Sequence, residues 1–320
     1  MPESVGWLSS RSVDELRRAV GLVMPETADR PVVLNHRVVT SDPRFFQGSA
    51  IMDGAYIVKF AWSEPPARRI THEGRVLAAL AGAGDGGLAV PPLVATATAP
   101  ALLITRLVPG EPLSWQHANE VRGEPRRRLV DDLARFVALL HEPDTLEVVR
   151  AAGVRLEMPE PQASTAELRE RFGRLVTPAQ RSIVDDWCDW VDDILAGPAD
   201  LSLLHGDLHG HNLVWDPATG ALQLVADFES AGEGDPAYDF RYLPGQAATA
   251  DLFLEVACRY EQLRGRALDL RRVMAWHIRT MLGDALWRTE AGVPLPGPGG
   301  TPSSWVEELE IRMRAVLDRR

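Results

Sequence analysis

Apolar positions near the start of the chain recur with helical spacing. The run follows Ser12, and Glu15 stands three residues later, a combination typical of a capping box at a helix N-terminus. We therefore predict a helix from Ser12 to Met24. From Val32 to Trp62 the pattern changes to β-branched and alternating residues, which indicates strands.

The strand region carries one strong hairpin signal. Asp53-Gly54 separates the segments AIM and AYIVKFAW, and Asp-Gly is favoured in tight hairpin turns. Upstream, VVLNHRVVT is expected to be a strand, and Ser41–Ser49, which contains Pro43 and Gly48, a loop. The first part of the chain continues with a helix near Arg69–Ala81, a loop over GAGDGGLAVPP and a strand over LLITRLV, which Pro109-Gly110 ends.

Helical patterns dominate the rest of the chain. The predicted helices cover 124–141, 166–195 (one or two helices), 247–264, 270–291 and 303–317. Short strands and turns are expected over SLLHGD, HNLVWD and ALQLVADF, with a hairpin loop at Asp216–Gly220. This order predicts an α+β fold with two lobes: a small antiparallel sheet in the N-terminal lobe, residues 1–108, and a larger, mainly helical C-terminal lobe, residues 109–320.

Composition and charge exclude several classes of protein. The 320 residues, 45% apolar and 25% charged, are unlike a disordered, collagen-like or coiled-coil chain. A net charge of -11 argues against a general nucleic-acid partner, and all of this acidity falls in residues 109–320. Cys188 and Cys258 form no disulfide framework. Because we find neither a signal peptide nor a membrane span, we expect a cytoplasmic protein without a membrane partner.

Lys59 is the only lysine among 34 basic residues. It stands within the apolar strand AYIVKFAW, where a charged group is costly unless it is paired. Glu73 lies on the apolar face of the following helix, so we predict that it pairs with Lys59. A compact ammonium fixed in this way suits phosphate oxygens. The alternatives are a purely structural salt bridge and a lysine that reaches solvent at a strand end.

A second polar group lies in LLHGDLHGHNLVW and LQLVADFE. Asp207, Asn212 and Asp227 fall at strand ends and turns, and their oxygens are the ligand type that Mg²⁺ prefers. In this interpretation Asn212 and Asp227 hold the metal, while Asp207 accepts a proton from a substrate hydroxyl. A polar loop without any chemistry is the plain alternative.

A zinc hydrolase site is a further alternative for the same segment. It would use His205, Asp207, His209 and His211 as ligands. Gly210 and the expected turn weaken the strand geometry that this site would need.

These segments together resemble the aminoglycoside phosphotransferase family, which comprises small-molecule kinases with a protein-kinase-like fold. HGDLHGHN resembles the catalytic loop of that family, ADFE its metal-binding motif, and GDPAYDF the segment that follows. YIVKF and THEGRVLAAL resemble its strand lysine and helix glutamate, and ITRLVPGEPL its hinge. The resemblance runs from about Val32 to Leu243, in the order of the family.

The resemblance implies cofactors and a role for each matching residue. ATP or GTP and Mg²⁺ would bind, with Lys59 on the α- and β-phosphates and oriented by Glu73. Asp207 would be the catalytic base, and Asn212 and Asp227 the metal ligands. The nucleotide base would contact the backbone of Thr105, Arg106 and Leu107. Gly48 and Ser49, at the tip of a glycine-poor loop, would contact the phosphates. Asp239 would have a structural role beneath the catalytic loop.

The acceptor is expected to bind the acidic C-terminal lobe. Asp185 and Asp189 share one side of a predicted helix and could attract a polyamine sugar, although a solvated helix face is the simpler interpretation. Asp284 and Glu290 on a later helix are equally suitable.

We accordingly expect an ATP- or GTP-dependent O-phosphotransferase that acts on a small, cationic molecule, an aminoglycoside first. The alternatives are a kinase of a macrolide, peptide antibiotic, sugar or amino alcohol and, more distantly, a nucleotide-binding module without catalysis. The oligomeric state stays open, as does whether the loop 292–303 covers the substrate.

Overall fold

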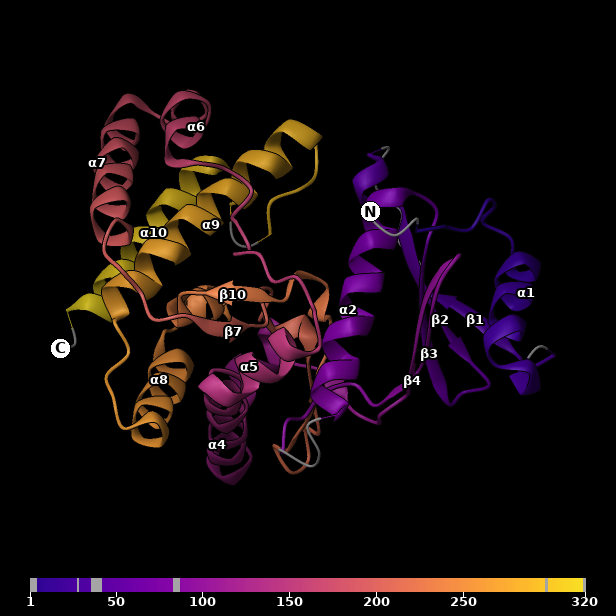
Figure 1. The fold of residues 1–320 in the computed structure, drawn as a ribbon. Helices are drawn as coiled ribbons and strands as arrows, with labels where there is room; N and C mark the ends of the chain where they lie inside the picture. Colours follow the sequence, from indigo (N-terminus) through magenta and orange to yellow (C-terminus); the bar gives the residue numbers. More distant parts are fainter. Residues whose placement is uncertain (1–4, 28, 36–41, 83–86, 297–298, 319–320) are drawn as a thin grey trace.

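The computed structural model describes residues 5–27, 29–35, 42–82, 87–296 and 299–318. The N-terminal lobe is built on an antiparallel sheet with the strand order β1-β2-β3-β5-β4 (Figure 1). Its strands are β1 (Val32–Asn35), β2 (Gln47–Met52), β3 (Tyr56–Ala61), β4 (Leu93–Thr98) and β5 (Ala101–Arg106).

Two helices cover opposite faces of this sheet, α1 (Val13–Val23) and α2 (Glu64–Gly82) (Figure 1). Val58 and Phe60 of β3 are buried in the core beneath α1, whereas Ala61 belongs to the core that contains the buried side of α2. Side chains alternate along a strand. Lys59 therefore points to the α2 face, as its sequence setting predicts.

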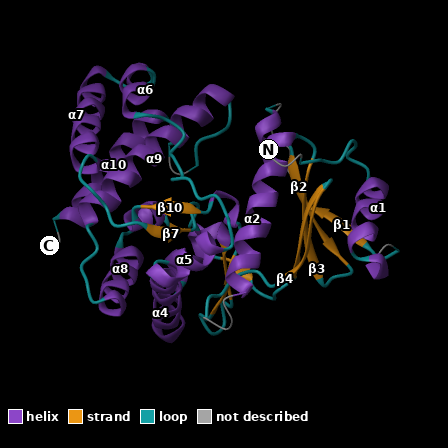
Figure 2. Cartoon of the chain, in the orientation of Figure 1, coloured by secondary structure: helices purple, strands orange, loops and turns teal. Residues whose placement is uncertain are grey.

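The C-terminal lobe is mainly helical and contains two small antiparallel sheets (Figure 2). Strand β7 (Ser202–Leu204) pairs with β10 (Gly232–Gly234), and β8 (Leu213–Trp215) lies between β6 (Glu111–Pro112) and β9 (Leu222–Val225). The helices are α3 (Trp115–Glu120), α4 (Gly123–Leu140), α5 (Pro143–Ala151), α6 (Thr165–Glu170), α7 (Pro178–Leu195), α8 (Asp251–Arg264), α9 (Leu270–Ala291) and α10 (Pro302–Leu317). No helix of the described residues is long and apolar enough to cross a bilayer.

Local sequence signals fix the N-terminal elements. Ser12 caps α1 by accepting a hydrogen bond from the Glu15 amide, but the Glu15 carboxylate returns to Ser9, so only half of the expected capping box forms. The hairpin between β2 and β3 is confirmed. Asp53 and Gly54 have φ values of 55° and 63°, the left-handed conformation that Asp and Gly tolerate best in such turns.

Several expectations about the N-terminal lobe need correction. Gly48 and Ser49 lie in strand β2, opposite Phe60 and Lys59, and not at the tip of a loop. Strand β4 was not predicted, although its alternating LVATAT pattern carries the signal. Helix α2 begins at Glu64, five residues before the expected start, because Pro65 and Pro66 are tolerated in a first turn. The expected continuation of the first strand over 36–40 lies outside the described residues.

The long helices of the C-terminal lobe match their predicted ranges closely. Two short helices, α3 and α5, were not predicted. Helix α8 begins at Asp251, four residues after its expected start, because the polypeptide up to Gly245 forms 3-10 turns instead. The chain passes from β5 to β6 between Arg106 and Glu111, which is where we continue to place the boundary between the lobes.

Candidate active site

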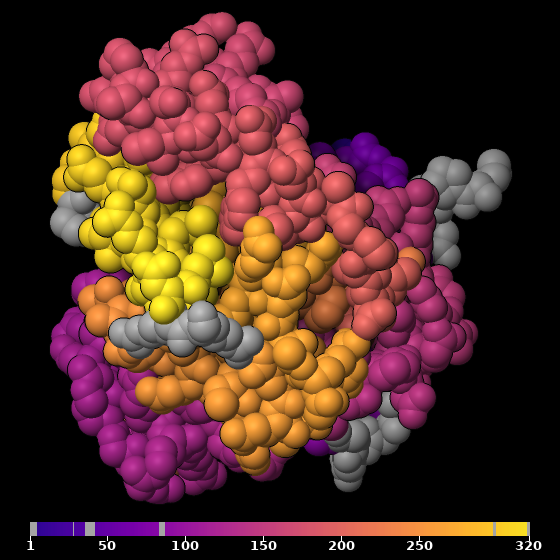
Figure 3. All heavy atoms as spheres, turned by 90° about the vertical axis from the view of Figure 1, so that its left-hand side faces the viewer, coloured from indigo at the N-terminus to yellow at the C-terminus, as the bar shows by residue number. Residues whose placement is uncertain are grey.

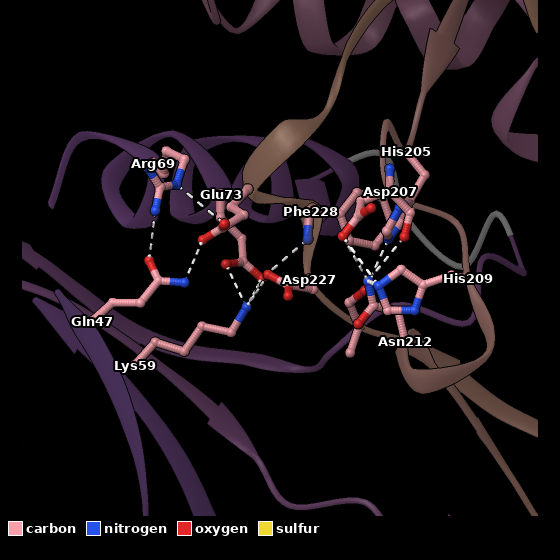
Figure 4. Close-up of polar contacts among 12 residues, drawn as sticks. Gln47, Lys59, Arg69, Glu73, His205, Asp207, His209, Asn212, Asp227 and Phe228 are labelled. Atoms are coloured by element: carbon pink, nitrogen blue, oxygen red, sulfur yellow. Dashed lines mark hydrogen bonds and ion pairs between the residues drawn. The ribbon is translucent and has the colours of Figure 1, made fainter. Parts of the chain in front are cut away.

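Lys59 connects the two lobes through carboxylates. Its Nζ donates hydrogen bonds to Glu73 Oε1 and Oε2 at 2.9 and 2.7 Å, and to Asp227 Oδ1 at 2.7 Å (Figure 4). The ion pair between the strand lysine and the helix glutamate is therefore present as predicted. The contact with Asp227 joins residues 168 positions apart, so it could not be read from local spacing.

Burial and neighbouring charges have opposite effects on the pKa values of Lys59 and Glu73. Burial alone would lower the Lys59 pKa, but the carboxylates of Glu73, Asp227 and Glu229 outweigh it and raise the pKa, so the ammonium is charged. Glu73 is only 1% exposed. Its burial raises its pKa to about 7 in spite of the opposing charge of Lys59.

Asp227 reaches Lys59 because the chain turns sharply after β9. Asp227 has a φ of 72°, in the left-handed region where non-glycine residues are uncommon. The amide of the next residue, Phe228, donates to Glu73 Oε1 at 3.2 Å. Glu73 thus holds both the lysine and the backbone that carries Asp227.

A second polar group faces the first from the loop between β7 and β8 (Figure 4). Asn212 Nδ2 donates to the Asp207 carbonyl oxygen at 2.9 Å and lies 3.4 Å from Asp207 Oδ2. His209 Nε2 lies 3.3 Å from the same Oδ2. Because the amide nitrogen of Asn212 points toward Asp207, its carbonyl oxygen is directed away from that residue and can serve another partner.

Asp239 holds the start of this loop in place by accepting hydrogen bonds from its backbone. It is fully buried and accepts hydrogen bonds from the amides of His205 and Gly206, both at 2.9 Å, and His141 Nε2 lies 3.1 Å from its Oδ2. The ring centroids of His205 and Phe228 lie 4.5 Å apart, and His205 Nε2 is hydrogen-bonded to the Ala226 carbonyl oxygen. Both residues hold the loop in place and do not face the space in front of Asp207.

Asp207 is ionised at neutral pH. Burial alone would raise its pKa, but the hydrogen bond from His209 and the positive charge of Arg241 lower the pKa to about 2. Arg241 is 3% exposed, and its Nη2 lies 3.9 Å from Asp207 Oδ1.

The alternative zinc site does not form. His205 is directed to the Ala226 carbonyl oxygen at 2.9 Å, and His211 is exposed. Across the described ranges, no three side chains among His, Cys, Asp and Glu cluster in a way that could hold a metal ion. A metal at this place would therefore need the amide oxygen of Asn212 in addition to carboxylates. That donor set of hard oxygens suits Mg²⁺ better than zinc, which prefers nitrogen and sulfur ligands.

The residues expected at the nucleotide lie in strands or close to them. The Ser49 hydroxyl donates to the Asn35 carbonyl oxygen at 2.9 Å, so it is already engaged. The amides of Arg106 and Leu107 donate to Pro92 and Ala55 at 2.9 and 2.8 Å. Thr105 and Gly48 pair within the sheet. A nucleotide base that bonded to the N–H groups of Arg106 and Leu107 would therefore have to displace these bonds, while contacts with the carbonyl oxygens of this segment stay a prediction.

A cavity of about 760 Å³ opens in front of Asp207. Its charged lining consists of Arg68, Arg69, Arg155, Arg241, Glu157, Glu160, Asp207, Glu229 and Asp284. Positive and negative groups are thus nearly balanced. The expected negative wall is absent from the described lining of this cavity.

The four predicted acceptor residues separate in space. Asp284 lines the cavity together with Asp207. Asp189 pairs with Arg169 at 2.6 Å, and Glu290 pairs with Arg171. Asp185, Asp189 and Glu290 are not part of the described cavity lining. Helix α7, which carries Asp185 and Asp189, lies on the surface beside α10 (Figure 3). Helical spacing groups residues on one side of a helix but does not say which side meets the cavity.

Three further residues of the site were missed or given another role. Glu229 accepts hydrogen bonds from Arg69 Nε at 3.1 Å and from Gln47 Nε2 at 3.2 Å, and these two bonds connect α2, β2 and the segment after Asp227. Burial raises its pKa. His209 was considered only as a zinc ligand. Arg241 directly follows GDPAYDF, and a charged residue in that apolar run is a signal that the sequence offered.

Comparisons with known proteins point to one family. A model of the phosphotransferase enzyme family matches residues 40–283. The uncharacterized protein YcbJ of Bacillus subtilis (strain 168) is 31% identical over 150 residues, 44% of this chain and 45% of that protein. Streptomycin 6-kinase of Streptomyces glaucescens is 30% identical over 136 residues, 41% of this chain and 43% of that protein. The chain thus spans less than half the length of these curated relatives.

Solved structures with the same fold cover nearly the whole chain. The GDP complex of an aminoglycoside 2'-phosphotransferase-IIIa has a TM-score of 0.67 at 18% identity and covers 95% of this chain and 99% of its own. The macrolide 2'-phosphotransferase MphH of Brachybacterium faecium has a TM-score of 0.56 at 21% identity, covering 89% and 91%. At these identities the likeness establishes a kinase-like fold and nothing finer.

Proposed function

Because the chain belongs to the phosphotransferase enzyme family, we propose that it transfers the γ-phosphoryl group of ATP or GTP to a hydroxyl of a small molecule. The observation that carries this proposal is the arrangement around Lys59. One ammonium holds a helix carboxylate and Asp227, and Asp207 and Asn212 face that group from the next loop (Figure 4). Phosphoryl transfer depends mainly on positioning and charge neutralisation, which such a set supplies.

Each residue of the set has a proposed role. Lys59 binds the α- and β-phosphates, and Glu73 keeps its ammonium in place. Asn212 and Asp227 would hold Mg²⁺, which supplies charge neutralisation at the phosphates when bound. Asp207 accepts a hydrogen bond from the acceptor hydroxyl and aligns its oxygen with the γ-phosphorus. Because the Asp207 pKa is about 2, this residue acts first by orientation and accepts the proton late in the transfer.

An aminoglycoside is the first acceptor class that we propose. The partial similarity to a streptomycin 6-kinase supports it, and within the charge-balanced lining of the cavity the carboxylate of Glu160 offers one contact for an amine. A macrolide is the second candidate, because the cavity also contains apolar and aromatic groups such as Met158, Pro161 and Tyr242.

An ADP-release assay tests the proposed function. The wild-type protein and Asp207→Asn would be assayed with ATP or GTP and Mg²⁺ against aminoglycosides, macrolides, peptide antibiotics and sugars. Acceptor-dependent ADP release by the wild type, greatly reduced in Asp207→Asn, is expected. Nucleotide binding without acceptor-dependent release by either protein would instead identify a binding module without catalysis.

A further inference from the structure

We propose that Arg69 is a positioning residue of the reaction. Together with Gln47 and Glu229 it fixes the start of β2 against the segment that follows Asp227, and so holds the N-terminal lobe in the position that phosphoryl transfer requires. This inference rests on the proposed function, because a fixed relation between the lobes matters to catalysis only if a phosphoryl group passes between two bound molecules.

Gln47, Arg69 and Glu229 form a closed hydrogen-bonded network between the lobes. Arg69 Nε donates to Glu229 Oε1 at 3.1 Å, and Gln47 Nε2 donates to Glu229 Oε2 at 3.2 Å. Arg69 Nη2 completes the network by donating to Gln47 Oε1 at 3.1 Å, and these two side chains point toward each other (Figure 4). Because each residue bonds to the other two, loss of one weakens the contacts that remain.

Arg69 also holds the chain just before β2. Its Nη2 donates to the Arg44 carbonyl oxygen at 2.8 Å, in the 3-10 turn that ends at Phe45. Phe45 lies against Trp287 of α9, and the two ring centroids are 5.6 Å apart. This turn and the start of β2 are therefore attached to the C-terminal lobe at two places, through the network and through α9.

The contact of Arg69 adds a second attachment to the one made by Glu73. The two residues are four positions apart on α2, so they lie on the same side of the helix, about 6 Å apart along its axis. Glu73 accepts from the Phe228 amide, and Arg69 contacts the next residue, Glu229. His72, between them in sequence, bonds through Nε2 to a carbonyl oxygen of the same segment at 2.7 Å. Contacts on successive turns prevent a rotation that one contact would allow, and Arg69 differs from the other two in carrying the attachment on to β2.

The network lies beside the reacting groups. Its three residues line the same cavity as Asp207. Further along β2, Ser49 is opposite Lys59 in the sheet. A shift of the network therefore moves the strand beside Lys59, and the bound phosphates with it, relative to Asp207. Because transfer needs the acceptor oxygen in line with the γ-phosphorus, a displacement of about 1 Å can lower the rate by about a hundredfold.

Direct binding of a metal is the alternative role for Glu229, since it stands two residues after Asp227. Its Oε1 and Oε2 instead accept hydrogen bonds from Arg69 and Gln47. A metal at this carboxylate would have to displace one of these bonds. The two roles therefore predict different results for a variant of Glu229.

Steady-state kinetics of Arg69→Met, Glu229→Gln and the double variant test the inference. Methionine keeps much of the length of the arginine side chain and removes its donors. Arg75→Met, an exposed change on the same helix and outside the described lining of the cavity, is the matched control. Streptomycin is the acceptor or, if it is not turned over, the compound of the ADP-release screen with the fastest turnover. Calorimetry with a nonhydrolysable ATP or GTP analogue and Mg²⁺ gives the nucleotide Kd and the number of binding sites.

In both single variants kcat per binding site should fall at least about tenfold, while the nucleotide Kd stays within about threefold of the wild type. Loss of folded protein would lower the number of sites and leave kcat per site unchanged. Because the residues act as one unit, kcat of the double variant should lie within about threefold of the lower single variant. Arg75→Met should keep the wild-type kcat. If Arg69→Met fails to fold, Gln47→Met, which removes another member of the network, should lower kcat at least about threefold.

Distances between two spin labels give a result that needs no acceptor. The labels are attached to the exposed Cys258 of α8 and to Leu22→Cys, at an exposed position of α1, whereas Cys188 is buried. With the nonhydrolysable nucleotide and Mg²⁺, the distribution of distances between the lobes should be at least about twice as wide in Arg69→Met as in the otherwise wild-type protein.

Wild-type kcat per site in Arg69→Met, effects that multiply in the double variant, or an unchanged distribution of distances would each overturn the inference. A higher Mg²⁺ requirement confined to Glu229→Gln would also overturn it, because Glu229 would then be a metal ligand. Failure of the proposed function gives a different result. In that case no compound of the screen causes ADP release by the wild type, whereas the distance measurement still decides whether Arg69 fixes the lobes.

Discussion

Lys59 Nζ lies 2.7 Å from both Glu73 Oε2 and Asp227 Oδ1, so one ammonium bridges the helix of the N-terminal lobe and the turn after β9 of the C-terminal lobe. A charge this well enclosed is stable only with its partners in place. The same geometry presents a fixed positive group where the two lobes meet.

Lys59→Arg keeps the charge but replaces a compact ammonium with a wide, planar fork. We expect the KM for ATP to rise or kcat to fall by about tenfold or more, because the larger group cannot keep both carboxylates and the phosphates in register. Steady-state kinetics at varied ATP concentration measure the effect. Arg174→Lys, an exposed change in the reverse direction in the C-terminal lobe, is the control, and wild-type kinetics in Lys59→Arg would remove Lys59 from the nucleotide site.

Asp207→Asn should lower kcat by about a hundredfold or more and leave the Kd for ATP within about twofold, since general-base and orientation effects are commonly of this size. Equilibrium nucleotide binding and single-turnover assays separate the two quantities. Asp216→Asn, in the exposed hairpin after β8, provides the comparison. Retained turnover in Asp207→Asn would contradict the proposed role.

Asp284→Asn and Asp189→Asn should behave differently. Asp284 lines the cavity with Asp207 and is paired with Arg288 at 2.8 Å, whereas Asp189 is paired with Arg169 outside the described lining. Only the change at Asp284 is expected to raise the acceptor KM, by about threefold to tenfold for loss of one charge contact. The measurement is acceptor KM at saturating ATP. An equal rise of the acceptor KM in both variants would show that α7 also belongs to the acceptor site.

Asp239→Asn should destabilise the whole protein. The carboxylate accepts from the amides of His205 and Gly206 and contacts His141. A carboxamide has only one oxygen, so at least one buried donor loses its partner, and we expect a loss of about 2 to 4 kcal/mol in the free energy of unfolding. Urea unfolding measures it, with the exposed Asp193→Asn as control. A loss below that of the control substitution would show that Asp239 is dispensable.

His277 should make stability fall in acid. Burial lowers its pKa from 6.5 to about 3, and its Nδ1 bonds to the Arg241 carbonyl oxygen. In the unfolded chain His277 therefore takes up a proton as the pH falls below about 6.5. In the folded protein it does so only near pH 3. The free energy of unfolding should fall as pH falls through this window, by about 2 kcal/mol between pH 7 and pH 5 from this group.

Urea unfolding at several pH values gives this dependence. His277→Asn, which cannot take up a proton, should show a shallower fall in stability with acid than the wild type. The exposed His211→Asn should keep the wild-type slope. Identical slopes in the wild type and His277→Asn would assign the acid sensitivity to other groups.

Local sequence signals predicted the structure best where a few neighbouring residues decide the conformation or the pairing of a side chain. The charged residue inside AYIVKFAW and the glutamate on the apolar face of the next helix predicted an ion pair that the structure contains. The Asp-Gly hairpin and the Ser12 cap also formed, because a turn or a cap is decided by a few neighbouring residues. Gly48 and Ser49 were misplaced because a glycine signal alone does not distinguish a loop tip from a strand.

By itself the sequence determined the α+β class, the long helices, and the identity and order of the polar residues from which the candidate site was first built, but not the parts taken by Glu229, His209 and Arg241. It could not determine which faces of distant elements meet. Asp227 reaches Lys59, Arg241 lies beside Asp207, and Asp284 rather than Asp189 lines the cavity. The reason is physical: periodicity fixes the direction of a side chain about its own helix or strand, whereas the packing of the cores fixes where that direction leads.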